Sequence, residues 1–437
     1  MDQPTIPEGA RALPHGARSL LFSSSIGTIV EWYDFFVFAS AAALVFDRAF
    51  FPEVDPLNGV LLALMTYAIG FITRPLGGFL FGVLGDRYGR KRALVWSLTL
   101  MGVATMGVGL VPAYTSIGIA APALLVLLRL VQGLAVGGEV GGALLLVTES
   151  LPAKRRGYFA AWPMIGGPAG NLLSSGMLAL LAVVFTEGAF VAWAWRIAFL
   201  ASGLLIGVGV WIRSRVDESP LYLAYAARRA AHHGDGLATT VASHWRSVLA
   251  VLVVKAGENA LFYVFTTFYV VYVTRVLHRP RGLALEGAAI ASAIEVATIF
   301  AAGAWSDRIG RRSVTAIGFV AAAIWAFVLF PVARHGDSAV LIAAAIGGIC
   351  HGLIVGGMSA FFVELFPTSA RYTGFSLGYQ LATVFSGAIA PLIGVALLNA
   401  YGSTLPISLY AAAMTGPGLV ALGMSHETRG ADLSIDR

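Results

Sequence analysis

Long apolar stretches alternate with short polar segments along almost the whole chain. Each stretch holds roughly the 20 mostly apolar residues that an α-helix needs to cross a bilayer. The twelve predicted spans cover residues 20–46, 57–85, 92–111, 118–148, 158–184, 191–213, 247–276, 284–305, 313–333, 338–365, 373–398 and 403–424. The residue-by-residue alternation typical of membrane β-strands does not occur in the sequence. The pattern therefore predicts an all-α integral membrane protein with twelve transmembrane helices.

The composition supports this prediction. Of the 437 residues, 58% are apolar and only 12% are charged, whereas a soluble domain has about 25% charged residues. The mean hydropathy is +0.80. The 51 glycines suit helices that pack closely in lipid, because small residues let two backbones approach.

The basic residues are divided unevenly between the two sets of connecting segments. With the N-terminus placed inside, 20 of the 29 lysines and arginines lie in cytoplasmic segments. The opposite side holds five, which are Arg48, Arg275, Arg279, Arg281 and Arg334. Because lysine and arginine concentrate in cytoplasmic loops, both termini are predicted to be cytoplasmic. The net charge of +6 is explained by this topology, and no nucleic-acid partner is expected.

The longest polar interruption divides the chain near its middle. It runs from Arg213 to Arg246 and is predicted to be a cytoplasmic linker between two six-helix bundles. The predicted boundaries are 1–19 for the N-terminal tail, 20–213 for the first bundle, 214–246 for the linker, 247–424 for the second bundle and 425–437 for the C-terminal tail.

Two charged motifs recur about half a chain apart. Residues 82–92 contain Gly85-Asp86-Arg87 and residues 303–312 contain Ser306-Asp307-Arg308, with the two aspartates 221 positions apart. Glu149 and Glu364, each followed by proline three residues later, are 215 apart. Two repeats of nearly the same period indicate a duplicated bundle, a design that transporters use for alternating access.

The repeated motifs are predicted to form a breakable latch at the cytoplasmic face. The helix dipole favours a carboxylate near a helix N-terminus, and the arginines of each motif are expected to pair with glutamates at neighbouring helix ends. The predicted latch residues are Gly85, Asp86, Arg87, Arg90, Glu149, Asp307, Arg308, Arg311, Glu364 and Arg371. A static topology anchor is the alternative.

Ionisable residues inside the predicted spans mark candidate functional sites, because they are expensive to bury in lipid. Arg129 and Lys255 are cations from different halves, which suits an anion bound between them. Alternatively, Arg129 pairs with Asp34 or Glu139, and Lys255 with Glu258, as structural ion pairs. The predicted substrate-binding residues are Tyr33, Arg129, Gln132, Lys255, Glu258, Asn259, Tyr263, Tyr379 and Gln380.

Asp34 is the favoured proton carrier among the buried carboxyl groups, with Glu31 and Glu139 as rivals. Burial favours a protonated carboxyl group and a nearby arginine favours the carboxylate. A substrate that competes for the arginine would therefore be coupled to the proton. Glu295 is predicted to be a lateral helix contact, and His351 lies in an apolar run with no matching catalytic triad.

Signatures of enzymes and nucleotide-driven pumps are missing from the sequence. The glycine-rich stretches do not follow a strand, and they lack the Gly-Lys-Ser/Thr pattern of phosphate-binding loops. We therefore predict a protein that is not an enzyme, binds no metal and needs no cofactor, with the proton as its coupling ion.

Several motifs carry a resemblance to a known family. They are Glu31-Trp32-Tyr33-Asp34-Phe35, Arg74-Pro75-Leu76-Gly77, Gly137-Gly138-Glu139, Gly257-Glu258-Asn259, Glu364-Leu365-Phe366-Pro367 and Gly378-Tyr379-Gln380. With these motifs the chain resembles the metabolite:proton symporters of the major facilitator superfamily, a group that includes transporters of shikimate, 2-oxoglutarate, citrate and proline/betaine. The resemblance implies two pseudo-symmetric bundles, a central substrate site and proton-coupled uptake in a bacterial inner membrane.

The sequence thus predicts a proton-coupled symporter that imports a small organic anion, a mono- or dicarboxylate, by rocker-switch alternating access. Arg129 and Lys255 would hold the substrate while Asp34 or a neighbouring carboxyl group holds the proton. Three alternatives stay open: a zwitterion symporter of the proline/betaine type, an effluxer of metabolites or drugs, and a non-transporting membrane sensor. The expected partners are the substrate and the lipid bilayer, and the protein is expected to be a monomer.

Overall fold

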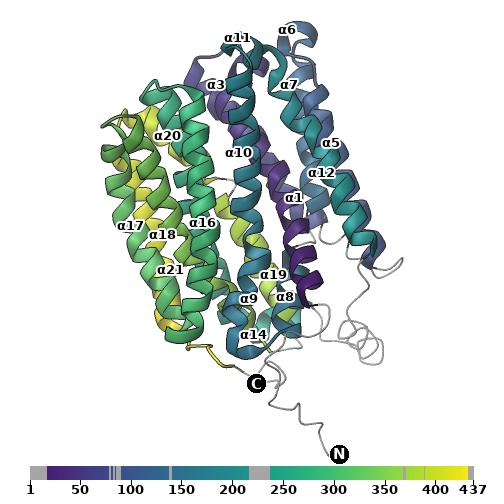
Figure 1. Cartoon of the computed structure of the whole chain (residues 1–437), viewed down its shortest axis with the longest axis vertical. Coiled ribbons are helices and arrows are strands. Elements are labelled where there is room, and N and C mark those ends of the chain that lie inside the picture. Colours follow the sequence, from purple (N-terminus) through teal and green to yellow (C-terminus); the bar gives the residue numbers. More distant parts are fainter. Residues whose placement is uncertain are drawn as a thin grey trace, which may run out of the picture.

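The computed structural model describes residues 17–77, 80–81, 84, 90–136, 140–215, 237–367, 371–387 and 389–431. Within these ranges the chain is almost entirely helical and contains no strand. Figure 1 shows the long helices running side by side from one end of the molecule to the other. The prediction of an all-α protein is confirmed.

The first half of the chain contributes eight longer helices and three short ones to the described structure. The longer helices are α1 (Ala17–Leu44), α3 (Pro56–Ile72), α5 (Arg90–Leu110), α7 (Ala120–Val136), α8 (Val140–Ser150), α9 (Arg156–Met164), α10 (Gly166–Val184) and α12 (Arg196–Arg215). The short helices are α2 (Phe46–Phe50), α6 (Tyr114–Ile117) and α11 (Glu187–Ala189). The 3₁₀ turn η1 (Ala153–Arg155) precedes α9, and the π-helical turn η2 (Phe190–Ala194) follows α11.

The second half contributes eight helices to the described structure. Its helices are α14 (Leu237–Tyr263), α15 (Tyr269–Val271), α16 (Arg281–Ile309), α17 (Arg311–Ala333), α18 (Asp337–Glu364), α19 (Arg371–Ala382), α20 (Ala390–Tyr401) and α21 (Leu405–Met424). Three π-helical turns join consecutive helices, η3 (Val264–Phe268), η4 (Tyr272–Val276) and η5 (Thr383–Gly387). Such turns are frequent at functional sites.

Twelve stretches of the described chain account for the predicted spans. Nine are long and apolar enough to cross a membrane, and the bent pair Glu187–Ala194 and Arg196–Trp211, with a 50° bend, makes a tenth. Two shorter apolar helices, Val95–Leu110 and Ala120–Val136, complete the set. Within the predicted fourth span, the structure describes α7 up to Val136 and α8 from Val140 onward.

The two halves of the chain lie side by side along the length of the bundle. In Figure 1 the first half is drawn in purple to teal and the second in green to yellow, with α10 beside α16 at the seam. The halves also touch where α9 packs on α16 and α18, and where α3 packs on α20. The seam between the halves therefore runs from one end of the bundle to the other.

Two glycines show how closely the helices within each half approach. A Cβ on Gly133 of α7 would lie 1.8 Å from the carbonyl oxygen of Gly70 in α3. A Cβ on Gly348 of α18 would lie 2.3 Å from the carbonyl oxygen of Ala291 in α16. Both clashes are with backbone, so no side-chain rotation relieves them, and each helix pair depends on its glycine.

Gly133→Ala is expected to lower the free energy of unfolding by about 1–3 kcal/mol, because α3 and α7 must separate to admit the methyl group. The measurement is the thermal unfolding midpoint of the purified protein in detergent. Gly176→Ala in α10 is the matched control, since a Cβ there meets no atom within 4 Å and alanine favours helix over glycine. Equal midpoints for the two variants would contradict this packing.

Candidate functional site

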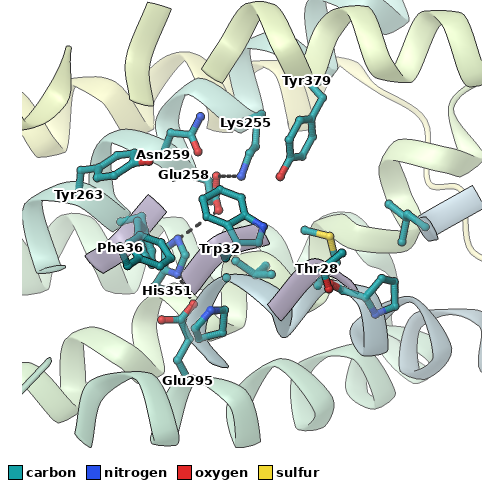
Figure 2. A pocket seen from close by; sticks show the side chains of 17 residues that line it. Thr28, Trp32, Phe36, Lys255, Glu258, Asn259, Tyr263, Glu295, His351 and Tyr379 are labelled. Carbon is teal, nitrogen blue, oxygen red and sulfur yellow. Dashed lines mark hydrogen bonds and ion pairs between the residues drawn. The ribbon is translucent and has the colours of Figure 1, made fainter. Parts of the chain in front are cut away.

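A narrow cavity lies between the two halves near the middle of the bundle. Its volume is about 40 Å³, room for a few water molecules at roughly 15 Å³ each. Its polar lining residues are Thr28 of α1, Lys255, Glu258, Asn259 and Tyr263 of α14, Glu295 of α16, His351 of α18 and Tyr379 of α19 (Figure 2). Trp32 and Phe36 of α1 form part of its apolar wall. A metabolite therefore enters only when helices of the two halves move apart.

Four buried ionisable side chains follow one another along this cavity, and we call them the charge chain: Lys255, Glu258, His351 and Glu295. The Lys255 Nζ atom lies 2.5 Å from Glu258 Oε2. The other oxygen of Glu258 lies 3.3 Å from His351 Nε2, and His351 Nδ1 lies 2.7 Å from Glu295 Oε1. Figure 2 shows the imidazole between the two carboxylates. Each of the four residues is at most 4% exposed.

The charge chain can hold and release a proton. Lys255 offsets one of the two carboxylates, and His351 Nδ1 and Glu295 Oε1 share a hydrogen bond whose donor depends on the tautomer of the imidazole. A bare lone pair on His351 Nε2 would face the Glu258 oxygen 3.3 Å away, which is unfavourable. Because uncompensated charge is costly to bury, the group is neutral when one further proton is shared by His351 and its two carboxylates.

A second polar cluster lies inside the first half, and we call it the Asp34 cluster. Thr105 donates a hydrogen bond to Asp34 Oδ2 at 2.8 Å and accepts one from Gln132 Nε2 at 2.5 Å. Arg129 Nη1 donates to Gln132 Oε1 at 2.8 Å. Arg129 and Asp34 are thus connected through two intervening side chains. Neither is among the described residues that line the cavity.

Aromatic rings enclose the guanidinium group of Arg129. Its Cζ atom lies 4.3 Å from the ring centroid of Phe35, 4.4 Å from that of Phe38 and 4.6 Å from that of Tyr67. These are cation–π distances. Arg129 Nε also donates to the Tyr67 carbonyl oxygen at 3.3 Å. These rings lie around the guanidinium group, and Arg129 is not among the described residues that line the cavity.

Ion pairs join the two halves at the end of the bundle where α8, α9 and α19 meet, which we call the latch face (Figure 1). Arg371 Nη1 lies 2.8 Å from Glu149 Oε1. Arg156 Nη1 lies 2.9 Å from Glu364 Oε1, and both side chains are buried. Glu364 also accepts from Arg311 Nε at 3.3 Å. Glu364 therefore binds one arginine from each half.

Asp307 holds the N-terminus of α9 across the seam. Its carboxylate accepts hydrogen bonds from the backbone N–H groups of Gly157 at 2.9 Å and Tyr158 at 3.0 Å. Arg311 Nη1 pairs with the same carboxylate at 2.7 Å. The helix dipole and the free N–H groups of α9 both favour this negative charge, so the aspartate of the second repeated motif ties the halves together.

Contacts between the halves also close the opposite end of the bundle. Asp47 Oδ2 of α2 lies 2.5 Å from Arg275 Nη2. Closer to the cavity, the hydroxyl groups of Tyr67 and Tyr263 share a hydrogen bond of 2.9 Å. Contacts between the halves therefore hold both ends of the bundle together, and transit requires one set of contacts to open at a time.

Protein-family models cover most of the chain. One described as "Sugar (and other) transporter" matches residues 20–238, and one described as "Major Facilitator Superfamily" matches residues 262–429. The chain is 37% identical over 420 residues to the inner membrane metabolite transport protein YhjE of Escherichia coli, with 94% of each chain covered. The chain belongs to the major facilitator superfamily.

Further relatives match the transporter over similar lengths. It is 36% identical to the shikimate transporter of Escherichia coli, covering 92% of this chain and 93% of that protein. It is 29% identical to the proline/betaine transporter of Escherichia coli, covering 92% and 82%. As a member of this superfamily the protein is a membrane transporter and not an enzyme.

Solved structures agree on the fold. A crystal structure of the D-xylose-proton symporter matches with a TM-score of 0.73 at 19% identity, covering 94% of this chain and 99% of that chain. The partially occluded inward-open xylose transporter XylE from E. coli matches with a TM-score of 0.70 at 18% identity, covering 96% and 100%. The predicted major facilitator fold of two six-helix bundles is confirmed.

The structure brings together only part of the predicted substrate site. Five of the nine predicted residues line the transporter's cavity, namely Lys255, Glu258, Asn259, Tyr263 and Tyr379. The other four, Tyr33, Arg129, Gln132 and Gln380, lie outside its lining. Tyr33 donates its hydroxyl hydrogen to the carbonyl oxygen of Ala198, 2.7 Å away. Their substrate roles stay predictions.

Sequence reasoning missed His351 and Glu295 as cavity residues. Glu295 does contact a neighbouring helix, as predicted, but it also lines the cavity and binds His351. The available signal was that both are ionisable residues inside apolar spans. Glu31 is a buried residue of α1 outside the cavity lining. The predicted proton carrier Glu139 lies outside the described residues.

The structure describes only some of the residues of the predicted latch. Gly85, Asp86 and Arg87 lie outside the described residues, as does the side chain of Arg90. Glu364 pairs with Arg311 of the second motif, as predicted. Glu149 pairs with Arg371, which belongs to neither motif. Arg308 is exposed, and its carbonyl oxygen accepts from Arg429.

Glu364→Gln is expected to slow uptake by at least about tenfold. Buried Arg156 loses its carboxylate and buried Arg311 keeps only that of Asp307, which destabilises the state closed at the latch face by about 3–5 kcal/mol. Initial uptake rates in proteoliposomes measure this. Glu427→Gln is the matched control, since Glu427 is exposed and accepts only from backbone N–H groups of the second half. Wild-type uptake by a folded Glu364→Gln protein would show that the latch face is a static anchor.

Proposed function

We propose that the protein is a proton-coupled symporter that imports a small organic anion, a mono- or dicarboxylate, by rocker-switch alternating access. The observation that carries this proposal is the charge chain on the cavity between the two halves. It combines a cation that can bind a carboxylate with a group that can bind a proton, and both lie on one continuous set of contacts.

The exchange of one ion pair couples the two solutes. Lys255 is held by Glu258 at 2.5 Å, so a substrate carboxylate must take the place of Glu258 at the ammonium group. Glu258 then loses its cation in a buried site, where an unpaired carboxylate is strongly disfavoured. A proton that reaches Glu258 through His351 neutralises it. One proton thus accompanies the carboxylate group that binds at Lys255.

The contacts at the two faces alternate in this proposal. Opening the latch face requires breaking the pairs of Glu364 and Glu149, and opening the other face requires breaking Asp47–Arg275. The moving bodies are residues 20–213 and 247–424, joined by a linker at 214–246. We assign the latch face to the cytoplasm of a bacterial inner membrane from the distribution of lysine and arginine. One chain encloses the complete cavity, and we propose that it works as a monomer.

One relative supports the carboxylate proposal, since the shikimate transporter is named for a carboxylic acid and matches 92% of this chain. The runner-up is a zwitterion. The cavity offers Lys255 to a carboxylate and Glu258 and Glu295 to a cationic group, and another relative is a proline/betaine transporter. These two substrate classes require a direct comparison.

Uptake under an imposed proton gradient makes that comparison. Proteoliposomes with an acidic exterior would be offered radiolabelled shikimate and, separately, glycine betaine. The proposal expects accumulation of shikimate, or of another carboxylate in a panel, that collapses when a protonophore is added. Uptake of glycine betaine but of no carboxylate would show that the substrate is a zwitterion and not an anion. Accumulation driven by sodium alone would refute proton coupling.

A further inference from the structure

A second pocket lies at the face opposite the latch face, where segments of both halves meet. Its volume is about 380 Å³, within the range of small-molecule sites. Its charged lining residues are Arg48 and Glu187 of the first half and Arg275, His278, Arg279 and Arg281 of the second. The pocket is separate from the central cavity, with which it shares no lining residue.

The arginines of this pocket are nearly all the basic residues that the chain places on this side. The predicted topology leaves five arginines there, and four of them line the pocket. The fifth, Arg334, lies elsewhere and donates to the Tyr272 hydroxyl oxygen at 3.1 Å. Because cations on this side oppose the usual charge bias of membrane proteins, their concentration around one pocket indicates a use for positive charge at that place.

The carboxylates of the region do not neutralise the pocket. Arg281 Nη1 lies 3.2 Å from Glu187 Oε1, and Arg48 Nη1 lies 3.6 Å from the same oxygen. Two guanidinium groups thus share one carboxylate. The Arg48 side chain is 51% exposed, so it can turn toward an incoming anion.

The other two arginines each have a carboxylate of their own. Arg279 pairs with Asp337 at 3.2 Å with a side chain 39% exposed, and Arg275 pairs with Asp47 at 2.5 Å and is mostly buried. The four arginines therefore exceed their three paired carboxylates by one positive charge. Arg275 pairs with a carboxylate of the other half, whereas Arg279 pairs within its own half.

The backbone around His278 is held in an uncommon conformation. His278 has φ of 51° and is the only non-glycine residue with positive φ in the described chain. Left-handed backbone is disfavoured for residues with a Cβ and persists where the surroundings enforce it, often at binding sites. The next residue, Arg279, donates its backbone N–H to the Val273 carbonyl oxygen at 3.0 Å. This turn fixes His278 and Arg279 on the pocket wall.

We propose that this pocket is an external capture site for the carboxylate that the transporter imports. The inference rests on the proposed function and adds a second, earlier binding step. Arginine forks bind carboxylates in a bidentate geometry, and a positively charged concave surface raises the local concentration of an anion. An anion in the pocket also competes with Asp47 for Arg275, which weakens the ion pair that holds this face closed.

The test is the Arg48→Gln/Arg279→Gln double variant, which removes the two more exposed guanidinium groups. Initial uptake of radiolabelled shikimate is measured against external concentration at low and at high ionic strength. The capture site predicts a KM about three- to tenfold higher at low salt, unchanged kcat, and a loss of the salt dependence that the wild type shows. Arg334→Gln is the matched control and should match the wild type, and Arg48→Lys/Arg279→Lys should restore most of the affinity.

The two proposals fail in different ways. Proton-driven shikimate uptake with the same KM and salt dependence in wild type and double variant would overturn the capture site and leave the proposed function intact. Uptake of glycine betaine without any carboxylate would overturn both. An equal rise of KM in Arg334→Gln would show a general surface-charge effect and would also overturn the capture site.

Discussion

Lys255→Gln is expected to abolish carboxylate uptake, lowering kcat/KM by at least about 100-fold. Lys255 is the only lysine or arginine among the described residues that line the cavity. Its loss removes the cation for the substrate and leaves buried Glu258 without its ammonium partner, and either effect is worth about 3 kcal/mol or more. Concentration-dependent initial uptake in proteoliposomes measures the change.

The double variant Lys255→Gln/Glu258→Gln separates these two effects. It removes the unpaired carboxylate, so the thermal unfolding midpoint should return toward that of the wild type. Uptake should stay absent, because the substrate still has no cation to bind. Restored uptake in the double variant would show that Lys255 serves only to neutralise Glu258, and the carboxylate site would have to lie elsewhere.

His351→Gln is expected to uncouple transport. Glutamine can still hydrogen-bond between Glu258 and Glu295, but it cannot carry a proton between them. The variant should lose accumulation driven by a proton gradient, whereas exchange of internal for external substrate should continue, because exchange needs no net proton movement. Parallel assays of gradient-driven uptake and of exchange measure the two activities.

Asp34→Asn provides the comparison for this prediction. Asp34 is fully buried and is bound by Thr105 at 2.8 Å, so asparagine keeps the shape and removes the proton site. If the charge chain carries the proton, Asp34→Asn keeps gradient-driven uptake and His351→Gln loses it. The reverse result would assign the proton to the Asp34 cluster, as the sequence alone suggests.

The fold could be predicted from the sequence because the features that indicate it, apolar spans and repeated motifs, are each contained in a short stretch of residues. A span of apolar residues has few alternatives in a bilayer, and the repeated motifs around Asp86 and Asp307 already indicate two related halves. The 50° bend of the sixth span could not be predicted in this way. It depends on packing between helices, which hydropathy does not record.

Only half of the charge chain could be predicted from the sequence, because the other half depends on the packing of helices that are far apart in the chain. Lys255 and Glu258 are three residues apart on one helix, so spacing alone predicts their contact. Glu295 and His351 are on α16 and α18, and only the packing of these helices with α14 brings them to Glu258. A single sequence contains no signal for that arrangement.

The substrate role of Arg129 stays a prediction, because the structure places this residue outside the cavity lining without testing its role. Its charge in the middle of a span marked it as a substrate ligand, and the rule that buried charges have functions is sound. The rule does not say which way the side chain points. Rings of Phe35 and Phe38, one helix away, surround the guanidinium group, and Gln132 takes one of its hydrogen bonds. Aromatic enclosure of this kind depends on helix rotation, which the motifs do not specify.

Proton movement on addition of substrate tests the central claim most directly. Proteoliposomes without any imposed gradient, in weakly buffered solution, would receive shikimate or the carboxylate that the uptake panel identifies, while the external pH is recorded. The charge-chain mechanism predicts that the exterior becomes more alkaline in step with carboxylate uptake, and that His351→Gln gives no such change. Carboxylate uptake by the wild type without any change of external pH would contradict the account.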